Sequence, residues 1–87
     1  MIITKQVVAI QLLCYLQHKI TIQNLVDWAE TAMNEHEFAE DSYETVREIV
    51  SRLGVADVKA FGLLWEDCEA MMIKLGYNIK IEAALAA

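Results

Sequence analysis

The sequence contains no proline and only three glycines, so it has few of the residues that break helices and form tight turns. A small β-sandwich needs about seven strands joined by turns, and three glycines supply too few of them. Hydrophobic residues make up 56% of the 87 residues, which excludes a disordered acidic tail or a proline-rich linker. The composition therefore favours a compact helical protein, and its length predicts one small domain over residues 1–87.

Cysteine is also scarce. Cys14 and Cys68 are too few for a disulfide framework, and both lie among large apolar residues. We expect two buried, unreactive thiols. A bridge between them would require an oxidising compartment, and nothing in the sequence indicates one.

The sequence has no hydrophobic run long enough to cross a membrane. The apolar stretch 7–16 is interrupted by Gln11 and falls short of the ~20 residues that a span requires. Its length suits a secretory signal, but Gln17-His18-Lys19 follows it and offers no small-residue cleavage site. We therefore expect a cytoplasmic protein that does not bind membranes.

Apolar spacing predicts four helices, over 4–18, 22–33, 42–53 and 64–75. Thr21 is placed to cap the second helix, and Asp41 with Glu44 fits a capping box at the third. Gly54 and Gly76 are placed to end the third and fourth helices.

Residues 77–82 alternate apolar and polar side chains, which is typical of a strand. A lone strand needs a neighbour, either residues 1–4 of the same chain or a second copy of the protein. The predicted fold class is all-α, a four-helix bundle-like domain with this short C-terminal extended segment. Its connections are residues 34–40, a polar linker or ragged helix end, and residues 55–62.

The apolar residues of the predicted helices indicate which faces are buried. The first helix is apolar almost all round, so we expect a partner on its second side and favour a homo-oligomer. The apolar residues of helix 42–53 form a regular stripe along one face, and those of helix 64–75 form a broader apolar face. Their expected core residues are Tyr43, Val46, Ile49, Val50 and Leu53 in the former, and Leu64, Trp65, Cys68, Met71, Met72 and Leu75 in the latter.

Negative charge is concentrated in one part of the chain. The formal net charge is −6, and eight of the thirteen acidic residues lie within 27–48, where Arg47 is the only base. This segment would repel a nucleic-acid backbone and attract a basic protein surface. Phe38 lies among the acids, where it is either an exposed interface anchor or a plug that folds the segment onto the core. The candidate partner-binding residues are Asp27, Glu30, Glu35, Glu37, Phe38, Glu40, Asp41, Glu44 and Glu48.

Other chemistry finds little support in the sequence. Cys14 and His18 lie one helical turn apart, but two ligands do not make a metal site and no third group completes a nucleophilic triad. His36 lies among acids, yet a Glu-x-x-His pair would need Glu at position 33, which is Met. The three glycines form no phosphate-binding motif. We expect no catalytic, cofactor or metal site, and therefore no enzyme.

Residues 9–33, AIQLLCYLQHKITIQNLVDWAETAM, resemble the first helical hairpin of the small bacterial immunity proteins that neutralise tRNA-cleaving colicins. The shared features are an apolar helix, a short Lys-Ile-Thr turn and a second helix that carries acids. The resemblance implies an acidic helical inhibitor that blocks the basic cleft of a nuclease. We thus expect a protein-binding module of this immunity or antitoxin type. The alternative is a structural homo-oligomer whose first helix and C-terminal strand form the seam.

Overall fold

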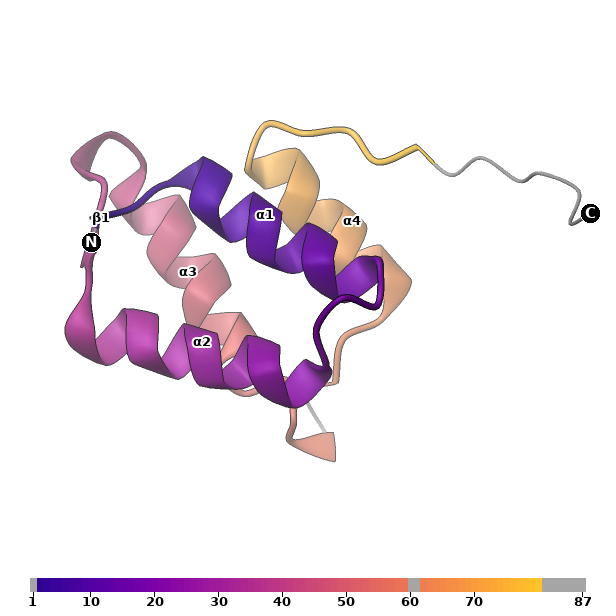
Figure 1. The fold of residues 1–87 in the computed structure, drawn as a ribbon. Helices are drawn as coiled ribbons and strands as arrows, with labels where there is room; N and C mark the ends of the chain where they lie inside the picture. The colour runs from indigo at the N-terminus through magenta and orange to yellow at the C-terminus, as the bar shows by residue number, and fades with distance from the viewer. Residues whose placement is uncertain (1, 60–61, 81–87) are drawn as a thin grey trace, which may run out of the picture.

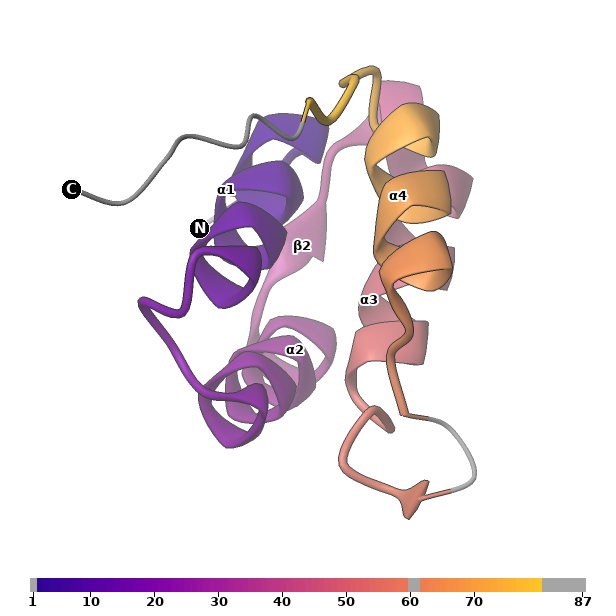
Figure 2. The ribbon, with the colours of Figure 1, turned by 90° about the vertical axis from the view of Figure 1, so that its right-hand side faces the viewer.

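The computed structural model describes residues 2–59 and 62–80, and the described residues form four α-helices, a short 3₁₀ helix and one two-stranded sheet of two residues per strand. Helices α1 and α2 form one layer, and α3 and α4 form the other (Figure 2). The prediction of a mostly helical four-helix domain is confirmed. The elements, in chain order, are β1 (Ile2–Ile3), α1 (Lys5–Leu16), α2 (Ile22–Glu35), β2 (Glu37–Phe38), a 3₁₀ helix (Glu40–Ser42), α3 (Tyr43–Leu53) and α4 (Trp65–Lys74).

Helix α1 begins after Thr4, whose side-chain oxygen accepts a hydrogen bond from the Val7 backbone at 3.2 Å. Val8 and Leu12 are fully buried on its inner face. Ile10 and Leu13 lie on its outer face and remain 52% and 41% exposed. The apolar outer face that the sequence predicted for this helix is therefore present in the single chain.

Helix α2 begins at the predicted cap. The Thr21 hydroxyl accepts a hydrogen bond from the Asn24 backbone, and the Asn24 side chain accepts one from the Thr21 backbone, each at 3.1 Å. Its inner face is fully buried through Leu25, Val26 and the small residues Ala29 and Ala32. Helix α2 also runs two residues beyond its predicted end, so the connection to α3 covers residues 36–42 instead of the predicted 34–40.

The two strands pair in parallel, Ile2 with Glu37 and Ile3 with Phe38. Ile3 is fully buried, and its carbonyl accepts a further bond from the Ala39 backbone at 3.0 Å. Of the two neighbours considered for the C-terminal segment, residues 1–4 of the same chain do not serve as one, because residues 2–3 pair with the α2–α3 connection. The described residues 77–80 form no strand, and residues 81–82 lie outside the described part of the chain.

Helix α3 has the predicted stripe but not the predicted cap. Val46, Val50 and Leu53 are fully buried and Ile49 nearly so. The Asp41–Glu44 capping box is wrong, because a 3₁₀ turn precedes the helix and Ser42 takes the cap position without a side-chain bond to the helix backbone. The Asp41 carboxylate instead accepts from the Ser42 hydroxyl at 3.2 Å.

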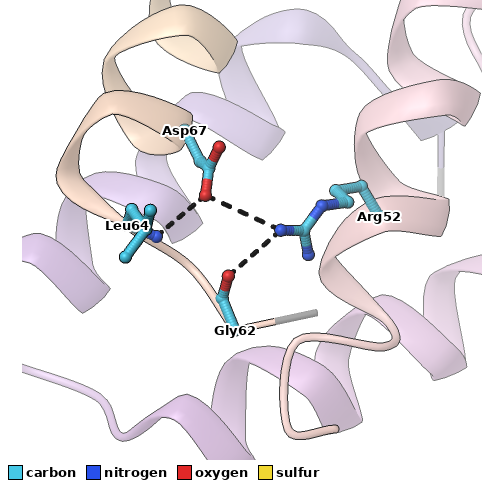
Figure 3. A network of polar contacts seen from close by, with 4 residues as sticks. All are labelled: Arg52, Gly62, Leu64 and Asp67. Carbon is cyan, nitrogen blue, oxygen red and sulfur yellow. Dashed lines mark hydrogen bonds and ion pairs between the residues drawn. The ribbon is translucent and has the colours of Figure 1, made fainter. Parts of the chain in front are cut away.

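Helix α4 is attached to α3 by polar contacts at both of its ends. Arg52 of α3 donates to the Gly62 carbonyl at 3.1 Å and pairs with Asp67 at 3.7 Å (Figure 3). The Asp67 carboxylate also accepts from the Leu64 backbone at 2.9 Å, which fixes the first turn of α4. At the other end, Lys74 and Glu48 pair at 3.2 Å.

The core face of α4 begins later than predicted. Cys68, Met71, Met72 and Leu75 are buried as expected, and Gly76 ends the helix with a φ of +92°, a conformation that favours glycine. Leu64 and Trp65 were expected in the core, but Leu64 is 65% exposed and Trp65 is also exposed. They lie at the N-terminal end of α4, where the chain arrives from the 62–64 segment and only later turns of the helix face the core.

Candidate interaction site

The acidic segment 27–48 runs through the second half of α2, the connection that contains β2 (residues 36–42) and the first half of α3. We call residues 36–42 the β2 connection. The parts of the segment in α2 and α3 fold back on one another. The β2 connection joins the two helices at the end of the molecule that holds β1, away from the turn between α1 and α2 (Figure 1, left). All eight acidic residues of this segment are exposed: Asp27, Glu30, Glu35, Glu37, Glu40, Asp41, Glu44 and Glu48.

The structure separates these acids into central and outlying members. Glu37 and Glu40 line one hollow beside the connection, and Asp41 and Glu44 line a smaller one next to it. Glu48 instead pairs with Lys74 of α4, on the side of α3 that faces α4.

Three acids on α2, namely Asp27, Glu30 and the exposed terminal residue Glu35, lie outside both hollows. Asp27 accepts a hydrogen bond from the Gln23 side chain at 2.9 Å, one turn back along the helix. Glu30 is exposed one turn further on. The dense part of the negative charge is therefore the connection and the start of α3, rather than the whole predicted segment.

We call the main depression of this region the acidic hollow. It has a volume of about 740 Å³ and lies between the end of α2, β2 and the first turns of α3. Its lining consists of Met33, His36, Glu37, Phe38, Glu40, Tyr43 and Arg47.

Two aromatic rings line the acidic hollow and contact each other. Phe38 is half-buried and packs against the core, while Tyr43 is 48% exposed. Their ring centroids are 5.9 Å apart with the planes at 75°, an edge-to-face contact. Phe38 thus folds the connection onto the core, and Tyr43 is the ring that presents itself to solvent.

Tyr43 and Arg47 are site residues that sequence reasoning missed. Tyr43 was assigned to the buried stripe of α3, but as the first residue of the helix it lies at the edge of the packed face. Arg47 was counted only as the single opposing charge. It is exposed, lines the acidic hollow and forms no ion pair within 4.0 Å with any described residue. Its position one turn after Tyr43 was the available signal, since residues four apart share a helix face.

His36 lines the acidic hollow at the end of α2. Its backbone donates to the Ala32 carbonyl at 3.3 Å, and its ring nitrogen Nδ1 is buried without a hydrogen-bond partner. A buried polar atom without a partner costs free energy, so this ring sits in an incompletely satisfied environment. No three candidate metal ligands cluster anywhere in residues 2–59 and 62–80.

The two thiols are free, and they differ in burial. Cys68 is buried in α4, and burial raises its pKa; the Asp67 carboxylate raises it further, and the Arg52 guanidinium partly offsets the shift. The raised pKa disfavours the thiolate, the nucleophilic form. Cys14 is only half-buried, in contrast to the expected burial.

A second depression lies at the opposite end of the molecule. It has a volume of about 670 Å³ and separates the α1–α2 turn from the start of α4. Leu64 and Trp65 form part of its lining and are exposed, and Lys19 contributes a positive charge beside His18. This apolar, weakly basic end contrasts with the acidic hollow.

No helix in the described ranges combines the length and the apolar character needed to cross a bilayer. Comparisons of the chain with protein-family models, with curated proteins and with solved structures found no match.

Proposed function

We propose that this chain is a protein-binding module that docks a basic partner through the acidic residues of the β2 connection and the helices that flank it. The observation that carries the proposal is that all eight acidic residues between residues 27 and 48 are exposed, while Arg47 is the only lysine or arginine in that range. The remainder of the chain holds five acidic residues and six lysines or arginines, so its net charge is close to zero. A field concentrated at one place steers a complementary partner and orients it during the encounter.

A nuclease is the partner class that this surface suits. Nucleases that cut RNA present basic clefts to the phosphate backbone, and a row of exposed carboxylates offers the same charge at the surface of a folded protein. The resemblance of residues 9–33 to immunity proteins of tRNA-cleaving colicins points the same way. The module would act by covering the cleft, without chemistry of its own.

The test compares two triple charge reversals. Glu37, Glu40 and Asp41 are changed to Lys in one variant, and Asp57, Glu66 and Glu69 in the other. Both variants change the net charge equally, but only the first removes charge from the connection. Association rates with a panel of basic ribonucleases, including tRNA-cleaving ones, are measured by stopped flow at about 50 and about 300 mM salt.

We expect the first variant to lose at least about tenfold in association rate at low salt and the second to lose less than about threefold. The wild-type rate should fall as salt rises. Equal losses in the two variants would show that net charge alone governs association and would contradict the proposal, as would tight binding that ignores salt.

A second candidate function is homo-oligomeric assembly. The observation that favours it is apolar exposure on the outer faces, where Ile10 and Leu13 of α1 and Ile73 of α4 each remain more than 40% exposed. Light scattering from micromolar to millimolar protein tests it. A dimer that dissociates in the Ile10→Asp/Leu13→Asp variant supports assembly through α1, and a monomer of about 10 kDa throughout contradicts it.

A further inference from the structure

The acidic hollow combines carboxylates, an exposed aromatic ring and room for one large side chain. Glu37 and Glu40 are exposed at its lining, and Tyr43 presents nearly half of its surface to solvent. Phe38 supports Tyr43 from the core side through their edge-to-face contact. The volume of the hollow is about 740 Å³, which is enough for one large side chain.

We propose that the acidic hollow binds an arginine side chain of the basic partner, a step that rests on the docking function proposed above. A guanidinium is planar and carries five N–H donors, so it pairs with a carboxylate through two hydrogen bonds and also stacks on an aromatic ring. The hollow offers both kinds of contact, from Glu37 or Glu40 and from Tyr43. A lysine ammonium is a compact, strongly hydrated charge and uses only part of this arrangement.

Two further lining residues bear on the proposal. His36 also lines the hollow, and its buried Nδ1 has no hydrogen-bond partner among the described residues. Arg47 contributes a positive charge to the same lining. It therefore competes with an incoming guanidinium, and its removal should strengthen binding.

The test uses capped pentapeptides, Gly-Gly-Xaa-Gly-Gly, in which Xaa is arginine, lysine or the uncharged isostere citrulline. Each peptide is titrated into the ¹⁵N-labelled full chain, and amide shifts are followed by NMR to roughly 20 mM peptide, a range that detects millimolar affinity. We expect the arginine peptide to shift resonances of residues 33–47. It should bind at least about threefold more tightly than lysine, and citrulline should not saturate.

Variants of the lining locate the binding. Glu37→Gln with Glu40→Gln should weaken the arginine peptide at least about fivefold, and Tyr43→Leu at least about threefold, while Tyr43→Phe retains most of the affinity. The matched control, Asp27→Asn with Glu30→Gln, removes the same charge from exposed positions outside the hollow and should change affinity by less than about twofold. Arg47→Gln should tighten binding. NMR spectra of each variant verify that it is folded.

The outcomes separate this inference from the docking function. Equal affinities for arginine and lysine, or equal losses in the Glu37/Glu40 and Asp27/Glu30 variants, would overturn the arginine site but leave docking by charge intact. No saturable shift with arginine, or weaker binding in Arg47→Gln, would also overturn it. A failed charge-reversal test with nucleases, with the peptide results as expected, would overturn the partner class and keep the site.

Discussion

The Arg52 guanidinium lies 3.7 Å from the Asp67 carboxylate, whereas the Lys74 ammonium lies 3.2 Å from the Glu48 carboxylate. The shorter contact is the weaker restraint, because its side chains are 56% and 70% exposed against 31% and 39% in the longer one. Arg52 also donates to the Gly62 carbonyl, and Asp67 accepts from the Leu64 backbone. The Arg52–Asp67 pair therefore fixes the backbone of residues 62–64 at the start of α4, whereas the Lys74–Glu48 pair joins two exposed side chains.

Replacing Arg52 by Met should cost about 1 kcal/mol of unfolding free energy, since it removes a hydrogen bond to backbone and leaves Asp67 with one partner fewer. Lys74→Met should cost less than about 0.5 kcal/mol, as exposed ion pairs do. Urea unfolding followed by circular dichroism measures both. A larger loss for Lys74→Met would show that the exposed pair is the stronger link between α3 and α4.

Adjacent leucines on α1 should respond very differently to truncation. Leu12 is fully buried and Leu13 is 41% exposed. Leu12→Ala should cost about 2–5 kcal/mol because it leaves a cavity, while Leu13→Ala should cost less than about 1 kcal/mol. Urea unfolding again provides the measurement. If Leu12→Ala is unfolded, the milder variant Leu12→Met replaces it in the comparison. Equal losses of unfolding free energy in Leu13→Ala and Leu12→Ala would show that the outer face of α1 is buried in an interface.

Local patterns predicted the parts of the fold that depend on local interactions. The Thr21 cap and the buried stripe of α3 follow from neighbours within one or two helical turns. The Asp41–Glu44 capping box failed because the preceding connection pairs with β1, which is distant in sequence, and enters α3 through a 3₁₀ turn. Leu64 was assigned to the core because it shares a helical face with Cys68 and Leu75, but it precedes the first turn of α4 and is 65% exposed.

The candidate site was predictable in composition but not in shape. The run of acids between residues 27 and 48 is visible in the sequence, and their exposure follows from the cost of burying unpaired carboxylates. The hollow depends on how the end of α2, β2 and α3 meet, which brings His36, Tyr43 and Arg47 to one lining. Tyr43 and Arg47 share a helix face at four-residue spacing, but His36 comes from the end of α2, and no local sequence pattern places it beside them.

The raised pKa of Cys68 predicts a pH dependence of stability. The thiol stays protonated in the folded protein at pH values where the unfolded chain, with an ordinary value of 9.0, already ionises. Ionisation then favours the unfolded state, so this contribution is constant below about pH 9 and lost as pH rises toward the folded pKa. Unfolding free energies of wild type and Cys68→Ala, compared between pH 7 and pH 10, should converge at high pH. A constant difference would contradict the shift.

Cys68 should also react slowly with a thiol reagent. Alkylation requires the thiolate and access, and burial denies both. At pH 8, iodoacetamide should modify the half-buried Cys14 at least about tenfold faster than Cys68 in the folded protein, and equally fast in urea. Mass spectrometry of the digested protein resolves the two sites, and equal rates without denaturant would show that α4 opens readily.

Repulsion among the carboxylates of the β2 connection should lower the unfolding free energy at low ionic strength, and added salt should weaken this effect. Glu40 is exposed near Glu37 and Asp41, and no described cation lies within 4.0 Å of it, whereas Glu48 has the ammonium of Lys74. Removing the Glu40 charge with Glu40→Gln should therefore raise the unfolding free energy by a few tenths of a kcal/mol at low ionic strength, because like charges repel.

The matched change Glu48→Gln also removes one charge from the acidic segment 27–48, but it breaks the ion pair with Lys74. It should therefore lower the unfolding free energy by a similar few tenths of a kcal/mol. Both effects should fade in about 1 M salt, where the Debye length is roughly 3 Å. Urea unfolding of the wild type and both variants at about 20 mM and about 1 M sodium chloride measures the four differences. Opposite signs at low salt identify local charge density as the cause, whereas effects of the same sign would show that the overall net charge of −6 governs stability and that the connection carries no special repulsion.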